Sequence, residues 1–233
     1  MKKMRFYPKS SLVLAVSAGL LAATSAWAEA PMNADDAGTL DKGGMKVEGV
    51  WSKDDRTTGG ELLFGLSPVD NLELEVAVAR GRNDEFKANG TGFGIKWVPY
   101  QNDTGWSLGA RFDHGRTRVT DHATPARHAK HDYELTGLAS YRLKNGQALH
   151  LNLGAARHKA QDGGQTSGTW GVGYEFPLAA NLQLTMEAFG EEGSRPDKSL
   201  GLRYEIRNGL KLSVATGRGN DRSFGQVGFA WEF

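Results

Sequence analysis

The feature that most constrains the fold of this chain is an alternation of apolar and polar residues that recurs along much of its length. In the stretch Leu72–Ala79, Leu or Val takes every second place and Glu or Ala takes the others. Residues 149–153, 182–188 and 210–214 repeat the pattern. Successive side chains of a β-strand point to opposite faces, so each segment predicts a strand with one apolar and one polar face.

About twelve such segments follow one another, and most are close to the 9–11 residues that a tilted strand needs to cross a bilayer. We expect them near residues 45–53, 58–66, 71–81, 89–98, 105–113, 132–143, 147–157, 167–176, 181–190, 198–206, 210–218 and 223–233. Every second connection is short and turn-like, with Asn-Gly pairs at 145–146 and 208–209. The others are more charged, and the longest is expected at 114–131. Short turns at one end and longer loops at the other are typical of outer-membrane barrels.

The polar faces of these segments carry many charges. They are Lys46, Glu48, Glu61, Glu73, Glu75, Lys96, Arg111, Asp113, Glu134, Arg142, Glu175, Glu187, Arg203, Glu205 and Lys211. Facing lipid, a basic residue near the bilayer midplane costs about 2–4 kcal/mol. A single soluble core could not hold so many ions either, because their desolvation exceeds what pairing returns. The sequence therefore predicts an all-β protein, a transmembrane antiparallel β-barrel of about twelve strands with a polar lumen. A soluble periplasmic barrel or sandwich is the alternative.

Within that barrel we expect a defined set of lumen-lining residues. They are Glu73, Glu75, Arg111, Glu134, Arg142, Glu175, Glu187, Arg203 and Glu205. The three arginines are expected to pair with the carboxylates. The inward charges include more acids than bases, which favours a weak cation preference that neutralising Glu75 and Glu187 should lower.

The N-terminus predicts a secretory signal peptide over residues 1–28. Four basic residues precede the apolar stretch 11–23, which runs into Ala26-Trp27-Ala28, an A-x-A cleavage pattern. The alternative, a single-pass anchor, is disfavoured because the apolar stretch is short for a membrane span. We expect 29–44 to form a periplasmic N-terminal segment and 45–233 the barrel. The remaining chain is slightly acidic, so nucleic acid is not an expected partner.

The C-terminal segment alternates aromatic with small or polar residues and finishes on Phe233. The last strand of Gram-negative outer-membrane barrels resembles this segment, and its terminal aromatic residue is recognised by the barrel-assembly machinery. The resemblance implies that machinery as a partner through Phe233, and the outer membrane of a Gram-negative bacterium as the location.

Three segments near the start of the barrel, 35–40, 43–48 and 65–74, add a family resemblance. They read Asp-Asp-Ala-Gly-Thr-Leu, Gly-Gly-Met-Lys-Val-Glu and Gly-Leu-Ser-Pro-Val-Asp-Asn-Leu-Glu-Leu. This opening resembles the outer-membrane transporter family associated with the meta-cleavage pathway of phenol degradation. The resemblance implies a barrel with a role in solute uptake, and it carries over no catalytic residue and no substrate.

The segment 114–131 contains four histidines, His114, His122, His128 and His131. Imidazole is a common transition-metal ligand, but the spacings match no compact metal motif, so no metal site is expected. The same segment holds Arg116, Arg118, Arg127 and Lys130, which we expect to be hydrated and to contact lipopolysaccharide phosphates.

Catalytic residues are not expected. His150 and His158, with Ser140 and Ser167 on neighbouring strands, are chance candidates for a hydrolytic group, but no nucleophile motif is present. The absence of cysteine excludes thiolate chemistry. We therefore predict a protein that is not an enzyme and has no cofactor. It forms a narrow channel or uptake pore for a small-molecule solute, with outer-membrane lipids as further partners. The alternatives are a non-conducting structural or adhesive barrel that acts through its loops, and an outer-membrane lipid-modifying hydrolase.

Overall fold

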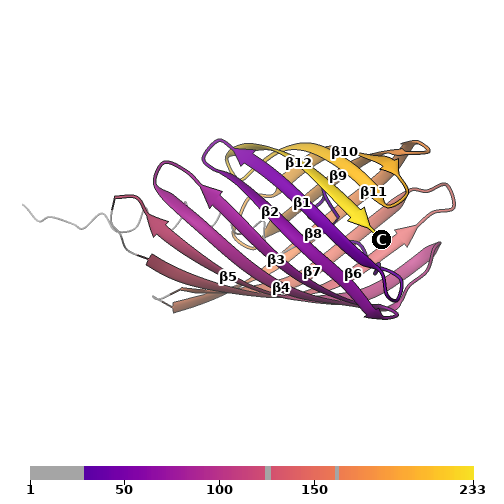
Figure 1. Ribbon diagram of the computed structural model, residues 1–233, viewed down its shortest axis with the longest axis horizontal. Helices are drawn as coiled ribbons and strands as arrows, with labels where there is room; N and C mark the ends of the chain where they lie inside the picture. The colour runs from indigo at the N-terminus through magenta and orange to yellow at the C-terminus, as the bar shows by residue number, and fades with distance from the viewer. Residues whose placement is uncertain (1–28, 124–126, 161–162) are drawn as a thin grey trace, which may run out of the picture.

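The computed structural model describes residues 29–123, 127–160 and 163–233, so the expected leader, 1–28, lies outside the described residues. Twelve antiparallel strands close into a barrel in which β1 pairs with β12 (Figure 1). The strands are β1 (Met45–Asp54), β2 (Thr58–Val69), β3 (Leu72–Arg82), β4 (Phe86–Tyr100), β5 (Gly105–Asp121), β6 (Arg127–Arg142), β7 (Ala148–Ala160), β8 (Gly163–Ala179), β9 (Leu182–Glu191), β10 (Asp197–Arg207), β11 (Leu210–Gly219) and β12 (Arg222–Glu232). The predicted all-β, twelve-stranded transmembrane barrel is confirmed. No helix among the described residues is both long and apolar enough to span a membrane.

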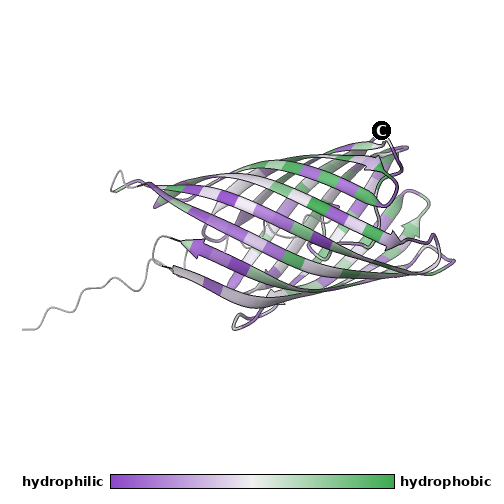
Figure 2. Cartoon of the chain, turned by 90° about the horizontal axis from the view of Figure 1, so that it is seen from below, coloured by the Kyte–Doolittle hydropathy of each residue, from purple (hydrophilic) through white to green (hydrophobic). Residues whose placement is uncertain are grey.

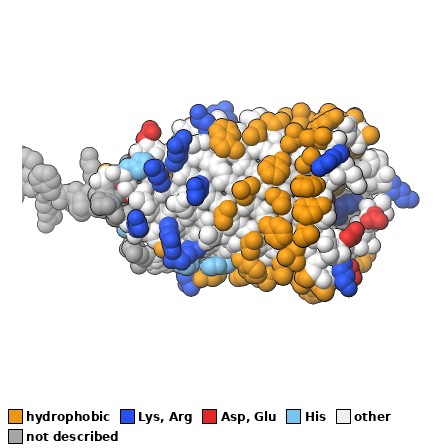
Figure 3. Space-filling model, in the orientation of Figure 1, with side chains coloured by type: hydrophobic (Ala, Val, Ile, Leu, Met, Phe, Trp, Pro, Cys, Tyr) orange, Lys and Arg blue, Asp and Glu red, His pale blue; other side chains and the backbone are white. Residues whose placement is uncertain are grey.

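The alternation seen in the sequence separates the two faces of the barrel. On β7 the side chain of Leu153 is 74% exposed, whereas Glu75 on β3 is 1% exposed and points inward. Exposed Leu, Val and aromatic side chains form an apolar outer band that a lipid bilayer can cover. The band lies nearer the end that carries the C-terminus (Figures 2 and 3). We call this the turn end, because the tight turns at 70–71 and 208–209 lie there, and the opposite end the loop end.

At the loop end the strands continue beyond the apolar band. The segment 114–131 was expected as a long loop, and that prediction is wrong for most of it. β5 runs to Asp121 and β6 starts at Arg127, with pairs such as Arg116↔His131 and Thr120↔Arg127. The two strands keep exchanging backbone hydrogen bonds although neither face is apolar there, so no hydrophobic alternation marks this stretch. The described connections at this end, such as 55–57 and 83–85, are short.

Residues 29–40 run inside the barrel, and we call this segment the strap. We expected 29–44 to lie in the periplasm as a separate segment, but the structure seats the strap against the lumen wall. It connects to β1 at the turn end, where Gly43 N–H donates to the Ser67 carbonyl at 2.7 Å. Ala34 and Ala37 on the strap are 2% and 0% exposed. The strap lies inside because the lumen offers both apolar contacts and partners for its charges.

Candidate functional site

The strap is anchored to the lumen wall by ion pairs. The Asp35 carboxylate lies 2.9 Å from Lys96 Nζ and 3.0 Å from Arg111 Nη1, on β4 and β5. Asp36 lies 2.9 Å from the same lysine and also pairs with Arg142 on β6. Two adjacent acids of the strap therefore meet three bases on three consecutive strands, so removing the strap would leave these inward bases without part of their counter-charge.

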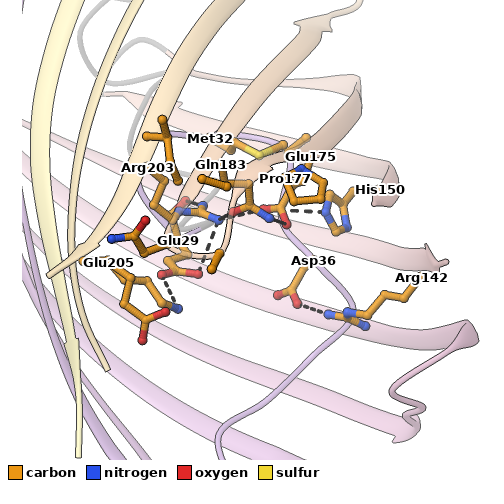
Figure 4. A pocket seen from close by; sticks show the side chains of 16 residues that line it. Glu29, Met32, Asp36, Arg142, His150, Glu175, Pro177, Gln183, Arg203 and Glu205 are labelled. Atoms are coloured by element: carbon orange, nitrogen blue, oxygen red, sulfur yellow. Dashed lines mark hydrogen bonds and ion pairs between the residues drawn. The ribbon is translucent and has the colours of Figure 1, made fainter. Parts of the chain in front are cut away.

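A second anchor holds the beginning of the strap on the opposite wall (Figure 4). The Glu29 carboxylate lies 2.7 Å from Lys211 Nζ and 3.7 Å from Arg203 Nη1. Arg203 also donates to the carbonyl of Ala30 at 3.0 Å and pairs with Glu175 at 2.7 Å. The strap is thus held to β10 and β11 at one point and to β4–β6 at the other, and it crosses the lumen between them.

Between the anchors, wall side chains satisfy the strap backbone. Glu187 accepts hydrogen bonds from the backbone N–H groups of Asn33 and Ala34, at 2.6 and 2.9 Å. The Asn152 amide accepts from Asp35 N–H at 2.7 Å, and Ser140 Oγ accepts from Ala37 N–H at 2.7 Å. A buried backbone group needs such a partner, so these contacts select one position for the strap.

Inward glycines make room for the strap. A Cβ built on Gly201 would lie 2.8 Å from Pro31 Cγ, and one on Gly173 would lie 3.1 Å from Ala34 Cβ and would overlap Met32. These separations are shorter than ordinary carbon contacts, so the strap packs closely on the wall at β8 and β10, and at Gly201 the wall's own Thr185 would be crowded as well.

The Asp36 carboxylate keeps its charge at the centre of this arrangement. Burial alone would raise the pKa of Asp36, but the positive charges of Lys96 and Arg142 outweigh burial and hold the pKa well below its ordinary value. The strap therefore stays anionic at this position over the ordinary range of pH.

The lumen wall formed by β1–β5 is filled by its own ions, which we call the charge cluster. Its members are Lys46, Glu48, Glu73, Glu75, Lys96, Arg111 and Asp113, all less than 10% exposed. Lys46 Nζ lies 2.6 Å from Glu75, and Arg111 Nε lies 2.9 Å from Asp113. A Cβ on Gly94 would lie 2.9 Å from Asp113 Oδ1 and 3.1 Å from Arg111 Nη2. The missing side chain at Gly94 thus allows oppositely charged groups to pack against the wall.

The wall formed by β6–β12 is hollow in comparison. A cavity of about 360 Å³, the turn-end cavity, is lined by residues of β6–β11 and the strap, among them His150, Glu175 and Glu205. A second, of about 390 Å³, the loop-end cavity, is lined mainly by β6–β10, β12 and the end of β1. Strap residues line both cavities, and no residue of β2–β5 lines either. The strap therefore lies between two cavities on one side of the lumen.

All nine residues expected to line the lumen lie on the inner face, but in different surroundings. Glu73, Glu75 and Arg111 belong to the charge cluster, and Glu187 binds the strap. The turn-end cavity is lined by Arg142, Glu175, Arg203 and Glu205, and the loop-end cavity by Glu134. Glu75 is sealed between Lys46 and Arg111 and lines neither cavity, so neutralising it does not test selectivity as the sequence suggested.

Arg111 and Arg203 pair with Glu75 and Glu175, as expected. The acid that Arg142 pairs with is Asp36 of the strap, not a glutamate of the wall.

The Ser and His candidates for hydrolysis are arranged differently from a catalytic group. Ser140 Oγ lies 2.8 Å from His150 Nδ1, but Ser140 is 0% exposed and binds the strap. His158 bonds Asp132 at 2.7 Å and Glu191 at 3.2 Å, while the Ser167 hydroxyl donates to Glu191 rather than to the histidine. No group of three or more metal-ligating side chains occurs in the described part of the chain.

Sequence reasoning missed the strap residues that complete the site, Glu29, Asn33, Asp35 and Asp36. One signal was available, because Gly171, Gly173 and Gly201 occupy inward positions in strands that also carry inward polar residues. A strand glycine often marks a close approach of another segment of backbone.

Comparisons with known proteins agree with the fold. The family model described as "Uncharacterised conserved protein UCP029691" matches residues 16–226. No match was found among curated protein sequences. A KdgM porin in complex with disordered oligogalacturonate is similar in structure, with a TM-score of 0.62 at 13% identity, covering 81% of this chain and 99% of the porin.

Two other solved barrels are similar. The COG4313 outer membrane channel from Pseudomonas putida F1 gives a TM-score of 0.61 at 12% identity, covering 85% of this chain and 98% of that one. A NanC porin gives 0.54 at 7% identity, covering 80% and 98%. At these identities the likeness establishes the barrel fold. The resemblance to the phenol-pathway transporters remains a prediction.

Proposed function

We propose that this chain, which belongs to the UCP029691 family, forms a narrow outer-membrane channel for small solutes that its own strap closes. The observation that carries the proposal is the position of the strap between two cavities on one side of the lumen. A purely structural barrel needs no cavities along one wall. The porin and channel folds that resemble this barrel support the same function by analogy.

The contacts of the strap explain how closure can be reversible. Apart from small apolar contacts such as that of Ala37 with Val98 and Leu138, they are ion pairs and hydrogen bonds to side chains. No strand of the barrel depends on the strap for its ladder. Moving the strap exposes Lys96, Arg142 and Arg203 to a water-filled lumen, where ions are far less costly than in a dry one. The barrel therefore survives opening, and the lumen then joins the two cavities.

Single-channel recording in planar bilayers tests the proposal. We compare the wild type, a variant lacking residues 29–40, and a double variant, Asp35→Asn with Asp36→Asn. The wild type should stay mostly closed, because the strap blocks the lumen. The deletion should give a larger and steadier conductance, and the double variant should open more often than the wild type. The matched control is Asp55→Asn with Asp70→Asn, which alters two acids outside the lumen.

An equally small conductance for the wild type and the deletion would contradict the proposal. It would mean that the charge cluster alone closes the lumen, and it would favour a non-conducting barrel that acts through its loop end. The solute-uptake role that the family resemblance implies would then lose its physical basis.

We further propose the outer membrane of a Gram-negative bacterium as the location, with cleavage after Ala28 and recognition of Phe233 by the barrel-assembly machinery. The aromatic Trp231 and Phe233 contact each other at 4.7 Å between ring centroids and form an apolar end to the last strand. Mass spectrometry of the protein extracted from outer membranes should give a chain that begins at Glu29. A chain that keeps residues 1–28 in that fraction would refute the cleavage.

Lipopolysaccharide is the proposed lipid partner, through a basic belt on the outer face of β3–β7. Its members are Arg80, Arg82, Lys87, Arg116, Arg118, Arg127, Arg157 and Lys159, all exposed. Lys130, expected to belong to this group, alternates onto the inner face instead. Figure 3 shows Lys and Arg side chains on the loop-end side of the apolar band, the level at which headgroup phosphates lie. Such phosphates accept charge-assisted hydrogen bonds from arginine.

The belt is tested by the lipid that co-purifies with the protein. Arg116→Gln with Arg118→Gln should reduce co-purifying lipopolysaccharide, because both side chains face outward in the belt. Lys198→Gln, a change on β10 outside the belt, should leave the amount unchanged. An equal amount in both variants would exclude the belt as the binding surface.

A further inference from the structure

Glu134 on β6 is a buried carboxylate at the loop-end cavity, and it forms no ion pair among the described residues. Its side chain accepts hydrogen bonds at Oε1 from Thr169 at 2.7 Å and, more weakly, from Thr136 at 3.4 Å. Its Oε2 has no hydrogen-bond partner among the described residues, and Glu134 is 7% exposed. A buried, unpaired carboxylate is costly, because nothing replaces the water it has lost.

Arg111, the base near Glu134 on the neighbouring strand, binds other acids, and two bases that line the cavity, Arg195 and Arg222, form ion pairs with other acids of its lining. Asp113 lies directly across from Glu134 in the ladder, and Arg111 binds Asp113 there, at 2.9 Å. Arg111 also pairs with Glu75 and Asp35, so its guanidinium is directed into the charge cluster and the strap. The residue that faces Glu134 across the β5–β6 ladder is therefore another acid, Asp113, which makes the surroundings of Glu134 more negative.

A second carboxylate oxygen lines the same cavity without a partner. Asp197 on β10 is 8% exposed, and its Oδ2 lies 3.2 Å from Arg222, while its Oδ1 has no hydrogen-bond partner in the described structure. Glu134 lies on β6 and Asp197 on β10, and both residues line this cavity. Two acids from different strands thus line the loop-end cavity, and their unpartnered oxygens are covered by neighbouring atoms.

The remaining lining suits the apolar part of a ligand. Phe189 on β9 and Phe224 on β12 line the cavity with Ala156 on β7. An aromatic face attracts a cation, and Arg222 already lies 5.2 Å from the centre of the Phe224 ring. A volume of about 390 Å³ is at the small end of the range for small-molecule sites.

We infer that the loop-end cavity binds a small organic cation, an ammonium or guanidinium group on a short apolar body, with Glu134 as its counter-charge. The inference deepens the proposed function, because it names a solute class for the same lumen. An organic cation fits better than a metal ion, since the described residues offer no cluster of three ligating side chains. Glu134 would accept the N–H donors, and Phe189 and Phe224 would cover the apolar body.

Isothermal titration calorimetry on the purified, detergent-solubilised protein tests the inference, with phenethylammonium as the probe. Phenethyl alcohol and phenylacetate, neutral and anionic molecules of similar shape, are the comparison ligands. The wild type should bind the ammonium more tightly than either. Glu134→Gln should weaken that binding by about tenfold or more, the factor that losing a charged hydrogen bond implies. Glu205→Gln, the same change in the turn-end cavity, should leave it unchanged.

Equal affinity of the wild type and Glu134→Gln for phenethylammonium, preference for phenylacetate, or no binding at millimolar probe would each overturn the inference. Heat-modifiable mobility on gels checks that each variant is a folded barrel. If Glu134→Gln does not fold, Asp197→Asn replaces it and should weaken binding as well. The conductance of the strap deletion is measured in parallel. A conducting deletion together with a wild type that binds no amine would refute the cation site and leave the proposed channel standing.

Discussion

The two sides of the lumen are closed in different ways. Along β1–β5 the wall's own ions pair with one another and pack against inward glycines, and only the end of β1 reaches a described cavity. Along β6–β12 the wall leaves two cavities, and the strap lies between them. One side is closed by residues that the barrel needs for its own stability. The other is closed by a segment that belongs to no strand. The difference indicates which side can open without unfolding the protein.

The largest expected effect is a difference in stability loss between two arginine variants, one on each side of the lumen. Arg111→Ala leaves Glu75, Asp113 and Asp35 without a shared partner in a dry site, so we expect a loss of about 3–5 kcal/mol of unfolding free energy. Arg203→Ala should cost less, about 1–3 kcal/mol, because water in the turn-end cavity can solvate Glu175. Urea unfolding in detergent, followed by tryptophan fluorescence, measures both. Equal losses would mean that the two sides are equally dry.

A smaller effect is expected from one added methyl group on each side. Gly94→Ala pushes on Asp113 and Arg111, which are fixed by their ion pairs, so we expect a stability loss of about 1–3 kcal/mol. Gly173→Ala pushes on Met32 and Ala34 of the strap, which can move away. The barrel should then keep its stability while the channel opens more often in bilayer recordings.

Gly137→Ala is the control for this pair, because its nearest neighbour is a backbone carbonyl at 3.5 Å, an ordinary contact. A barrel destabilised as much by Gly173→Ala as by Gly94→Ala would show that the strap is a fixed part of the core.

The smallest expected effect is that of mild acid on closure. The folded-state pKa of Asp36 lies below its unfolded value, so its contribution is complete above the unfolded value of about 4 and is lost only as the pH falls further, through the folded pKa. Between pH 7 and pH 5 the open probability of the wild type should therefore stay constant. If the open probability instead rose with a midpoint near pH 6, a histidine would control the strap. His150, which lies beside Ser140, would then be the first residue to substitute.

Local alternation was sufficient to predict the barrel. In Leu72–Ala79 it identified both the strand and the inward direction of Glu73 and Glu75, because a strand has only two faces. It failed above the apolar band, as at Arg116 and Thr120 in β5, where both faces are polar and only backbone pairing maintains the strand.

The strap could not be predicted in the same way, because its position depends on partners far along the chain. Asp35 meets Lys96 and Arg111, which are 61 and 76 residues away. Nothing in the short segment 29–40 repeats with the period of a strand. The direction of Arg111, which pairs with Asp113 and the strap and not with Glu134 among the described residues, was also beyond the sequence.

The pairing of β1 with β12 has a consequence for the order of events during biogenesis. This seam runs from Lys46↔Glu232 to Asp54↔Phe224 and joins residues close to the two ends of the described chain. It encloses a longer loop of chain than any other strand pair here, so its closure carries the largest entropy cost. Until β12 arrives, β1 keeps an open edge to which a strand of another molecule could add. Deleting β12 should therefore expose two edges at once and turn a closed barrel into an aggregating one.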